Sequence, residues 1–510
     1  MLAFLTFLPL CGAILLLAVP GKSTALLRGI ALGVTLLTAA IGVQSYLEFD
    51  SAVLGFQQGV SLAWFTLDRP SGPIAIDFHV GLDGISLLLV ALTVLLMPLV
   101  VLSSYGHVHE RVKEFLFWLL VMETGMLGVF VALDLVLFYF FWEVSLVPLY
   151  FLVGIWGGEN RLYATLKFFL YTVAGSLVML VGVLALVWRT GCASVPELIE
   201  RASSLDFPTQ AWIFAAFALA FAIKVPILPF HTWLADAHTE APTSGSVLLA
   251  GVLLKMGTYG LLRFGIEMFP RVALEASPLF MMLGAVGIVY GALLAMAQTD
   301  LKRLIACSSV SHLGFVVLGL FALTGPALRG ATLQMVNHGL STGLLFLLVG
   351  MVYERTHTRA LDRYGSLASV MPVFALFFVF TVLSSAGLPG LNGFVGEYLI
   401  LAGTSPTSPL WAAVGVSGVV LGAVYLLMAT RRVLFGPIVH EENRALTDLG
   451  AREVALLVPL CVLVVWLGVQ PNAFLARCTP SLDRVVERVE DARFAASLEH
   501  SAGHAAEVER

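Results

Sequence analysis

Charged residues are scarce in this chain. Of its 510 residues, 12% are charged and 59% are hydrophobic, and the mean hydropathy is +0.94. A soluble domain is about a quarter charged, so this composition excludes a soluble globular protein. The net charge of −5 is small and the basic residues are scattered, so no binding surface for nucleic acid is indicated.

Cofactor motifs are missing as well. The five cysteines lie far apart without a C-x-x-C pair, so neither zinc nor an iron–sulfur cluster is indicated. No G-x-G-x-x-G follows a strand, and no phosphate-binding G-x-x-x-x-G-K-S/T occurs. We therefore expect no cofactor or metal in this chain, and any redox group or nucleotide must belong to other chains.

Long apolar runs take up most of the sequence. Runs of about 20 residues, enough to cross a bilayer core, recur through residues 1–468. They predict an all-α integral membrane protein with about fourteen transmembrane helices. The first run has no basic residue before it and is interpreted as a retained helix, not a signal peptide. The predicted spans begin near Leu2, Leu27, Gly81, Phe115, Leu135, Ala164, Ala211, Thr243, Pro278, Leu304, Ala331, Pro372, Leu410 and Glu453.

Positive charges predict the orientation, because short cytoplasmic loops carry an excess of Lys and Arg. With the N-terminus outside, fifteen Lys and Arg fall in inner loops and six in outer loops. We therefore expect a multi-pass protein of a bacterial inner membrane, or an equivalent energy-transducing membrane, with both termini outside. Residues 48–77 are too polar to span and predict an outer loop or hairpin. The tail 481–510 predicts a surface helix docked on a neighbour or, equally, a solvated and partly disordered end.

Ionisable residues occur deep inside the apolar runs, where a charge costs at least about 2.5–3.5 kcal/mol. They are Glu143, Lys224, Lys255, His312, His338 and Glu397. One interpretation is a static ion pair between Glu143 and Lys224 that holds two helices together. The whole set favours a proton relay, because burial lowers the pKa of a lysine and a nearby carboxylate raises it again. Either histidine can extend the relay or simply hydrogen-bond two helices.

Two spans contain helix breakers beside an ionisable residue. Pro226 and Pro229 follow Lys224, and a glycine- and proline-rich stretch precedes Glu397. Interrupted helices in both halves are typical of transporters with inverted repeats. The breaks fall in the seventh and twelfth predicted spans, which predicts two inverted five-helix repeats. We divide the chain into N-terminal helices (1–112), a first repeat (113–266), a second repeat (275–435) and a last helix with a polar tail (436–510).

Several long segments around these residues resemble one family in order and content. They are FYFFWEVSLVPLYFLVGIWGG, KFFLYTVAGSLVMLVG, KVPILPFHTWLADAHTEAPTSGSVLLAGVLLKMGTYGLLRF, TDLKRLIACSSVSHLGF, NHGLSTGLLFLLVGMVYERTHTR and GLPGLNGFVGEYLI. Together they resemble the antiporter-like subunits of respiratory complex I, which are related to Mrp-type cation/proton antiporter subunits. The resemblance runs from about Phe115 to Arg432.

The resemblance implies roles for the buried ionisable residues. Glu143 and Lys224 match the family's ion pair, and Lys255 matches its connecting lysine. His312 and His338 match the central histidines, and Glu397 matches the terminal residue, where glutamate marks the M type. Polar positions of the family also match Glu123 and Asp134, which can equally be hydrogen-bonding or interfacial residues. The segment with His231, Asp236, His238 and Glu240 matches the family's cytoplasmic mouth, and we interpret it as a solvated loop.

The resemblance implies a proton-translocating subunit of NADH:quinone oxidoreductase that performs no redox step itself. Its partners are then the L-type and N-type antiporter-like subunits, the lipid bilayer and protons. A sodium/proton antiporter subunit, a membrane subunit of a related hydrogenase complex and a purely structural role stay open as alternatives. Glu397 in place of lysine argues against the antiporter.

Overall fold

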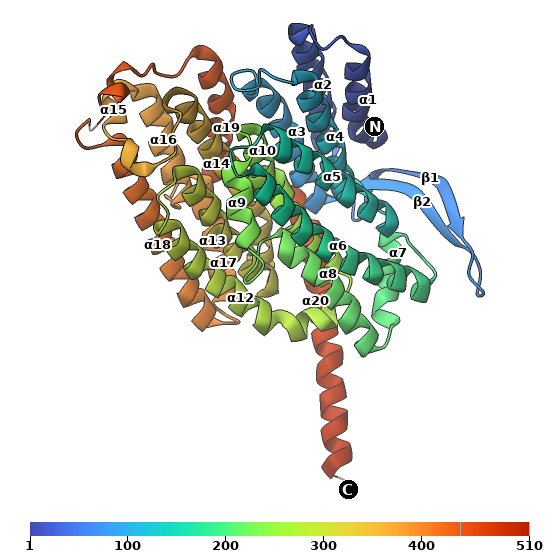
Figure 1. Cartoon of the computed structure of the whole chain (residues 1–510). Helices are drawn as coiled ribbons and strands as arrows, with labels where there is room; N and C mark the ends of the chain where they lie inside the picture. Colours follow the sequence, from blue (N-terminus) through green and yellow to red (C-terminus); the bar gives the residue numbers. More distant parts are fainter. Residues whose placement is uncertain (439, 509–510) are drawn as a thin grey trace.

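The computed structural model describes residues 1–438 and 440–508, and Figure 1 shows that they form mostly helices. Among these residues, twelve helices are long and apolar enough to cross a membrane. The predicted integral membrane protein is therefore confirmed. The twelve are α2 (Thr24–Glu48), α3 (Gly84–Ser103), α4 (Val112–Val131), α5 (Leu135–Trp156), α6 (Arg161–Thr190), α8 (Phe207–Lys224), the helix Thr243–Ile266, α12 (Pro270–Met296), α13 (Leu301–Phe321), α14 (Gly325–Thr356), α18 (Pro409–Leu434) and α19 (Ala451–Val469).

The remaining helices are shorter or more polar. Two are apolar but shorter than 18 residues, α1 (Leu2–Ala18) and α16 (Pro372–Ser385). The others are α7 (Val195–Arg201), α9 (Thr232–Glu240), α15 (Leu367–Val370), α17 (Asn392–Thr404), α20 (Asn472–Val508) and the 3₁₀ turns η1 (Ala202–Ser204), η4 (Leu361–Arg363) and η5 (Glu441–Ala445).

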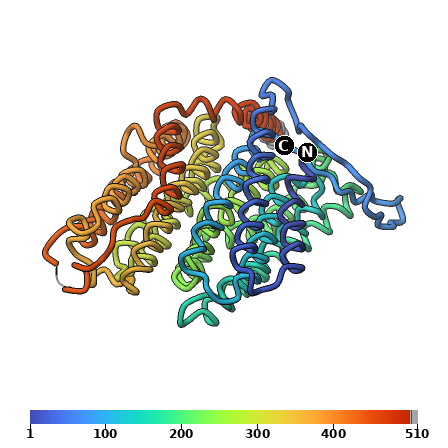
Figure 2. Tube along the Cα trace, turned by 90° about the horizontal axis from the view of Figure 1, so that it is seen from above, coloured from blue at the N-terminus to red at the C-terminus, as the bar shows by residue number. Residues whose placement is uncertain are grey.

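A two-stranded hairpin departs from the helical architecture. Strands β1 (Gln57–Leu67) and β2 (Ile74–Leu82) pair antiparallel, and their many β-branched and aromatic residues suit a pleated strand. Of the loop or hairpin expected for residues 48–77, the hairpin forms, and it extends to Leu82. Figure 2 shows the hairpin reaching away from the helices. Leu62 and Trp64 on β1 are exposed.

Two apolar stretches are interrupted where the breakers predicted it. Helix α8 ends at Lys224, and α9 begins only at Thr232. Helix α16 ends at Ser385, and α17 begins at Asn392 after a turn in which Gly387 and Gly390 have φ of +77° and +93°. Glycine adopts this left-handed conformation without the steric cost that other residues incur. Each interruption lies next to an ionisable side chain: Lys224 is the last residue of α8, and a Cβ on Gly387 would lie 3.4 Å from Glu397 Oε2.

The helix Thr243–Ile266 contains two π-helical segments that the sequence did not predict. It runs through α10 (Thr243–Leu248), the π segment η2 (Leu249–Leu253), α11 (Leu254–Gly260) and the π segment η3 (Leu261–Ile266). Such segments are rare and occur frequently at functional sites. This helix, α13 and α14 are fully buried over their most apolar windows, so they form the centre of the molecule.

The two halves of the chain lie side by side around this centre. Figure 2 shows the N-terminal and C-terminal helices as two adjoining groups. In the first group α4 packs against α5 and α6 against α8; in the second α12 packs against α13 and α14 against α17.

The C-terminal tail is helical and docks on its own chain. Its ion pairs join Asp483 to Arg329 at 2.6 Å and Arg484 to Glu267 at 3.1 Å. The expected surface helix forms, and its first part packs on this chain. Docking of this helix on a neighbour stays a prediction. Its last part projects beyond the other helices in Figure 1.

Replacing Gly257 with alanine tests how closely α8 and α11 must approach. A Cβ atom there would lie 2.7 Å from Val225 Cγ2 and 3.0 Å from the Phe221 carbonyl oxygen. Because backbone cannot easily move away, we expect Gly257→Ala to destabilise the protein by about 1–3 kcal/mol. The measurement is the thermal midpoint in detergent. Gly33→Ala is the control, since a Cβ there meets nothing within 4 Å; equal midpoints for both variants would contradict the packing described.

Candidate functional site

Lys255 lies fully buried just after the first π segment. Its ammonium donates to the Ala250 carbonyl oxygen, five residues earlier, and lies 2.6 Å from His338 Nδ1 on α14. Close approach of the two helices makes this contact possible, since a Cβ on Gly339 would lie 2.8 Å from the Gly251 carbonyl oxygen. The π segment and the two glycines therefore set the position of the lysine.

His312 continues the line from His338 toward the interrupted helix α17. The two imidazole rings have centroids 5.9 Å apart, and His312 Nδ1 lies 3.0 Å from Glu397 Oε1. His338, His312 and Glu397 are 3%, 8% and 4% exposed, so all three are enclosed by protein. The structure thus brings four of the six predicted residues into one row, Lys255–His338–His312–Glu397, which we call the central row.

Polar side chains that the sequence analysis missed surround the far end of the central row. Gln334 Nε2 donates to Glu397 Oε1 at 3.2 Å, and the Tyr425 hydroxyl lies 3.3 Å from His312 Nε2. A cavity of ≈ 10 Å³ opens beside His312 and His338, close to the smallest space that holds one water. Asn, Gln, Ser and Tyr in apolar runs are common helix-packing residues, so only their contacts reveal these neighbours.

Glu143 and Lys224 lie near each other but apart from the central row. Lys224 is 2% exposed, and its ammonium lies 5.4 Å from the ring centroid of Trp142, the neighbour of Glu143 in α5. Within the described chain the two charged groups form no ion pair at 4.0 Å or less, and Glu143 Oε1 has no hydrogen-bond partner. The static ion pair considered from the sequence is therefore not formed.

Helix α11 connects this pair to the central row. A Cβ on Gly257 would lie 3.1 Å from Lys224 Cβ, and Gly257 stands two residues after Lys255. Lys224 and Lys255 thus lie on two helices that are in direct contact.

A cavity of ≈ 580 Å³ lies at the N-terminal end of the helix Thr243–Ile266. Glu240, Lys302 and Arg359 are among its lining residues. Lys302 is 7% exposed and donates to the Ala241 carbonyl oxygen. This cavity gives polar access to the end of the helix that carries Lys255.

His238, two residues before the cavity-lining Glu240, is not solvated as the sequence had suggested. It lies on α9, is 0% exposed and stacks on Phe346 with ring centroids 4.7 Å apart. Among the described residues neither of its ring nitrogens has a hydrogen-bond partner. His231 is likewise buried at 8% exposure, so the solvated-loop interpretation is wrong for both histidines.

Glu123 and Asp134 are both buried, but they differ in their hydrogen bonds. Glu123 is 0% exposed, and neither carboxyl oxygen has a hydrogen-bond partner in the part of the chain described. Asp134 caps α5 by accepting from the Val136 and Leu137 amides at 2.8 and 3.0 Å, and it also accepts from the Asp77 amide. Burial raises the pKa of Asp134 to about 6, while these backbone hydrogen bonds oppose the shift. Asp134 is therefore a capping residue.

Replacing Asp134 tests this assignment. Asp134→Ala removes the cap and should cost about 1 kcal/mol of stability, whereas Asp134→Asn keeps an acceptor for the same amides. The thermal midpoint of the purified variants measures both effects. A proton-carrying role would instead show as normal stability with impaired proton transport in Asp134→Asn.

No group of three or more His, Cys, Asp and Glu that could hold a metal occurs among the described residues. The cysteines described there are free thiols. Chemically, the central row is a buried series of groups that can donate and accept protons.

Comparison with known families covers most of the chain. The family described as NADH:quinone oxidoreductase/Mrp antiporter, TM, matches residues 132–422, and NADH-ubiquinone oxidoreductase chain 4, amino terminus, matches residues 32–129. The NADH-quinone oxidoreductase subunit M of Rhodobacter capsulatus is 43% identical over 96% of both chains.

Solved structures share the fold. A chain of respiratory complex I from Thermus thermophilus superposes with a TM-score of 0.84 at 33% identity, over 96% of this chain and 99% of that chain. A chain of the Mrp complex from Dietzia sp. DQ12-45-1b gives 0.84 at 21% identity over 96% and 99%, which shows a common fold only. Identity, coverage and family match together place this chain in the family of NADH-quinone oxidoreductase subunit M (chain 4).

Proposed function

We propose that this chain moves protons across an energy-transducing membrane as the M-type subunit of a proton-translocating NADH:quinone oxidoreductase. The observation that carries the proposal is the central row, in which Lys255, His338, His312 and Glu397 follow one another inside buried helices. Imidazole both accepts and donates protons near neutral pH, and lysine and glutamate complete the row at its ends. The relative named NADH-quinone oxidoreductase subunit M, which this chain covers over 96% of its length, supports this function.

Electron transfer belongs to other subunits in this proposal. The L-type and N-type antiporter-like subunits are the expected neighbours within the membrane. The similar chain from Thermus thermophilus is likewise part of a respiratory complex I. Coupling then reaches this chain as a mechanical or electrostatic change at its helices.

Glu143 and Lys224 form the switch of the proposed mechanism. A buried lysine releases its proton when its carboxylate partner is distant and takes one up when the partner returns. The two groups form no ion pair at 4.0 Å or less, and in this mechanism that is the releasing arrangement. Contact between α8 and α11 at Gly257 allows that change to influence Lys255.

The architecture proposed from the sequence is fourteen spans with two inverted repeats, at residues 113–266 and 275–435. Support comes from α1 and from the interrupted pair α16–α17, which together add two crossings to the twelve long helices. Each repeat would then have its interrupted helix in the fourth position, α8 with α9 and α16 with α17. An odd number of crossings per unit inverts the second relative to the first.

Orientation with both termini outside follows from the same scheme. Basic residues assigned to the inner side, Lys302 and Arg359, line the 580 Å³ cavity. Those assigned to the outer side, Arg263, Arg271 and Arg329, contact Asp83, Glu499 and Asp483 near the C-terminal helix. The cavity is thus the cytoplasmic mouth in this proposal.

A secondary sodium/proton antiporter is the main alternative from the sequence. The likeness to the Mrp complex shows a common fold and carries no argument about transport. Glu397 hydrogen-bonds within a row of groups that exchange protons. Proton translocation therefore accounts better for the residues observed.

Lys224→Arg separates a relay from a structural ion pair. Arginine keeps the positive charge but does not lose its proton in proteins, so a structural role would survive and a relay would not. We expect Lys224→Arg and Lys224→Ala to assemble and to slow proton pumping about tenfold, equivalent to ~1.4 kcal/mol in the barrier. Proton uptake by vesicles containing the whole enzyme, driven by NADH, is the measurement. Normal pumping in an assembled Lys224→Arg enzyme refutes the role.

Glu397→Gln tests the end of the central row. The amide can still hydrogen-bond to His312 and Gln334 but cannot ionise, so assembly should persist while pumping per electron falls. Asp362→Asn, a neutralised exposed carboxylate, is the matched control and should pump normally. Equal proton-to-electron ratios in the two variants would remove Glu397 from the pathway.

A further inference from the structure

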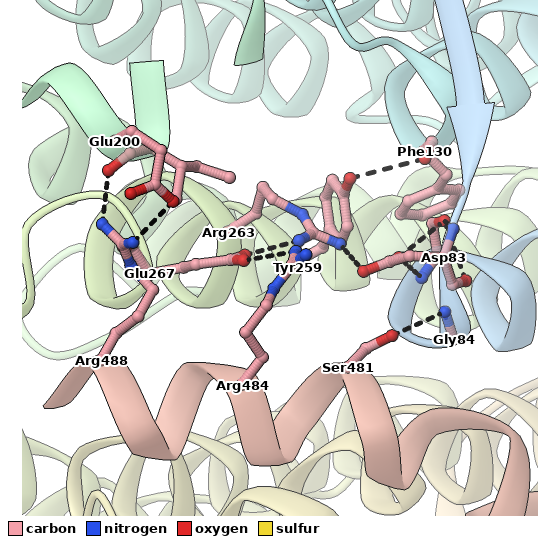
Figure 3. A network of polar contacts seen from close by, with 12 residues as sticks. Asp83, Gly84, Phe130, Glu200, Tyr259, Arg263, Glu267, Ser481, Arg484 and Arg488 are labelled. Carbon is pink, nitrogen blue, oxygen red and sulfur yellow. Dashed lines mark hydrogen bonds and ion pairs between the residues drawn. The ribbon is translucent and has the colours of Figure 1, made fainter. Parts of the chain in front are cut away.

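A buried ion cluster closes the C-terminal end of the helix that carries Lys255. Arg263 in η3 pairs with Asp83, the residue before α3, and with Glu267 just beyond η3. All three are at most 1% exposed. Figure 3 shows Arg263 between the two carboxylates, with Tyr259 beside it.

The C-terminal helix covers this cluster from outside. Arg484 donates to Glu267 Oε1 at 3.1 Å, and Arg488 donates to the Glu267 carbonyl oxygen at 3.2 Å. Ser481 accepts from the Gly84 amide at 3.1 Å, so α20 also holds the start of α3. Figure 3 shows these three side chains reaching from one face of α20.

Charge is balanced only when α20 is included. Asp83 and Glu267 carry two negative charges, and Arg263 supplies one positive charge. Arg484 supplies the second positive charge. Without it, a net negative site would face the outer surface and attract hydronium and other cations.

Tyr259 separates the cluster from Lys255 on the same helix. Its ring lies 5.7 Å from Arg263 Cζ and packs edge-to-face on Phe130 and Phe264, at centroid distances of 5.5 and 6.2 Å. Its hydroxyl donates to the Phe130 carbonyl oxygen at 3.4 Å. From Lys255 outward, a proton therefore meets an aromatic layer and then a fixed guanidinium.

The two ends of the helix Thr243–Ile266 differ in how easily a proton can reach them. The N-terminal end opens on the 580 Å³ cavity, and the C-terminal end reaches the cluster beneath α20. Arginine does not release its proton, and a fixed arginine is an electrostatic barrier to proton passage. The barrier stands on the side opposite to the cavity.

We propose that Asp83, Arg263, Glu267 and Arg484 form a charge-balanced seal that prevents protons on Lys255 from leaking to the outer face. The inference rests on the proposed function of Lys255 as a proton carrier. The seal directs proton exchange by Lys255 to the cavity side and to the central row. Arg484 is a positioning residue, because it acts through Glu267 and Arg263 and does not touch the row.

Passive proton leak tests the seal without electron transfer. The assembled enzyme is reconstituted into vesicles, a membrane potential is imposed by potassium and valinomycin, and proton influx is followed with an internal pH dye. We expect Arg484→Gln to raise the leak at least several-fold over the parent enzyme and Arg484→Lys, which keeps the charge, to stay near the parent. Arg271→Gln is the matched control, since Arg271 pairs with the exposed Glu499 on the same helix.

A second variant identifies the route. In Arg484→Gln combined with Lys255→Met, we expect the leak to return to the parent value, because no carrier remains behind the open seal. Leak in assembled Arg484→Gln equal to that of Arg271→Gln overturns the proposal, as does a leak that persists without Lys255. Since no NADH is added, these outcomes are separate from the pumping defects that test Lys224 and Glu397.

Discussion

The hydrogen bond between Lys255 and His338 is the interaction on which the arrangement of this protein depends. An ammonium group in a fully buried helix needs partners, because burial of an unpaired charge is costly. Here a π segment places the Ala250 carbonyl oxygen within reach, and the glycine contact between η2 and α14 places the imidazole at 2.6 Å. The most buried helices of the fold are therefore those that position the lysine.

The protein contains two kinds of buried charged group, which have different roles. In the cluster of Asp83, Arg263 and Glu267, every ionised group faces an opposite charge, which suits a permanent structure. In the central row a lysine faces an imidazole, and an imidazole faces a carboxylate. The central row consists of groups that can exchange protons, whereas the cluster is built around an arginine, which cannot.

Much of the fold could be predicted because the bilayer imposes simple rules on sequence. Apolar length predicted the helices, Pro226 and Gly387 predicted the interruptions, and the polar stretch 48–77 predicted a loop or hairpin outside the spans. The two π segments could not be predicted from the residue pattern, and the helix that contains them packs against the distant elements α3, α8 and α14. Docking of α20 on its own chain likewise depends on Glu267, which is 217 residues from Arg484 in sequence.

The sequence by itself determined which ionisable residues lie deep in the apolar runs, because a charge within such a run is evident from the order of residues alone. Only the tertiary structure decided how they connect. It joined Lys255, His338, His312 and Glu397, left Lys224 and Glu143 without an ion pair, and buried His238 where a solvated loop was expected. Contacts between distant helices depend on side-chain packing at small residues such as Gly251, Gly257 and Gly339, and hydrophobic periodicity does not encode which helices meet there.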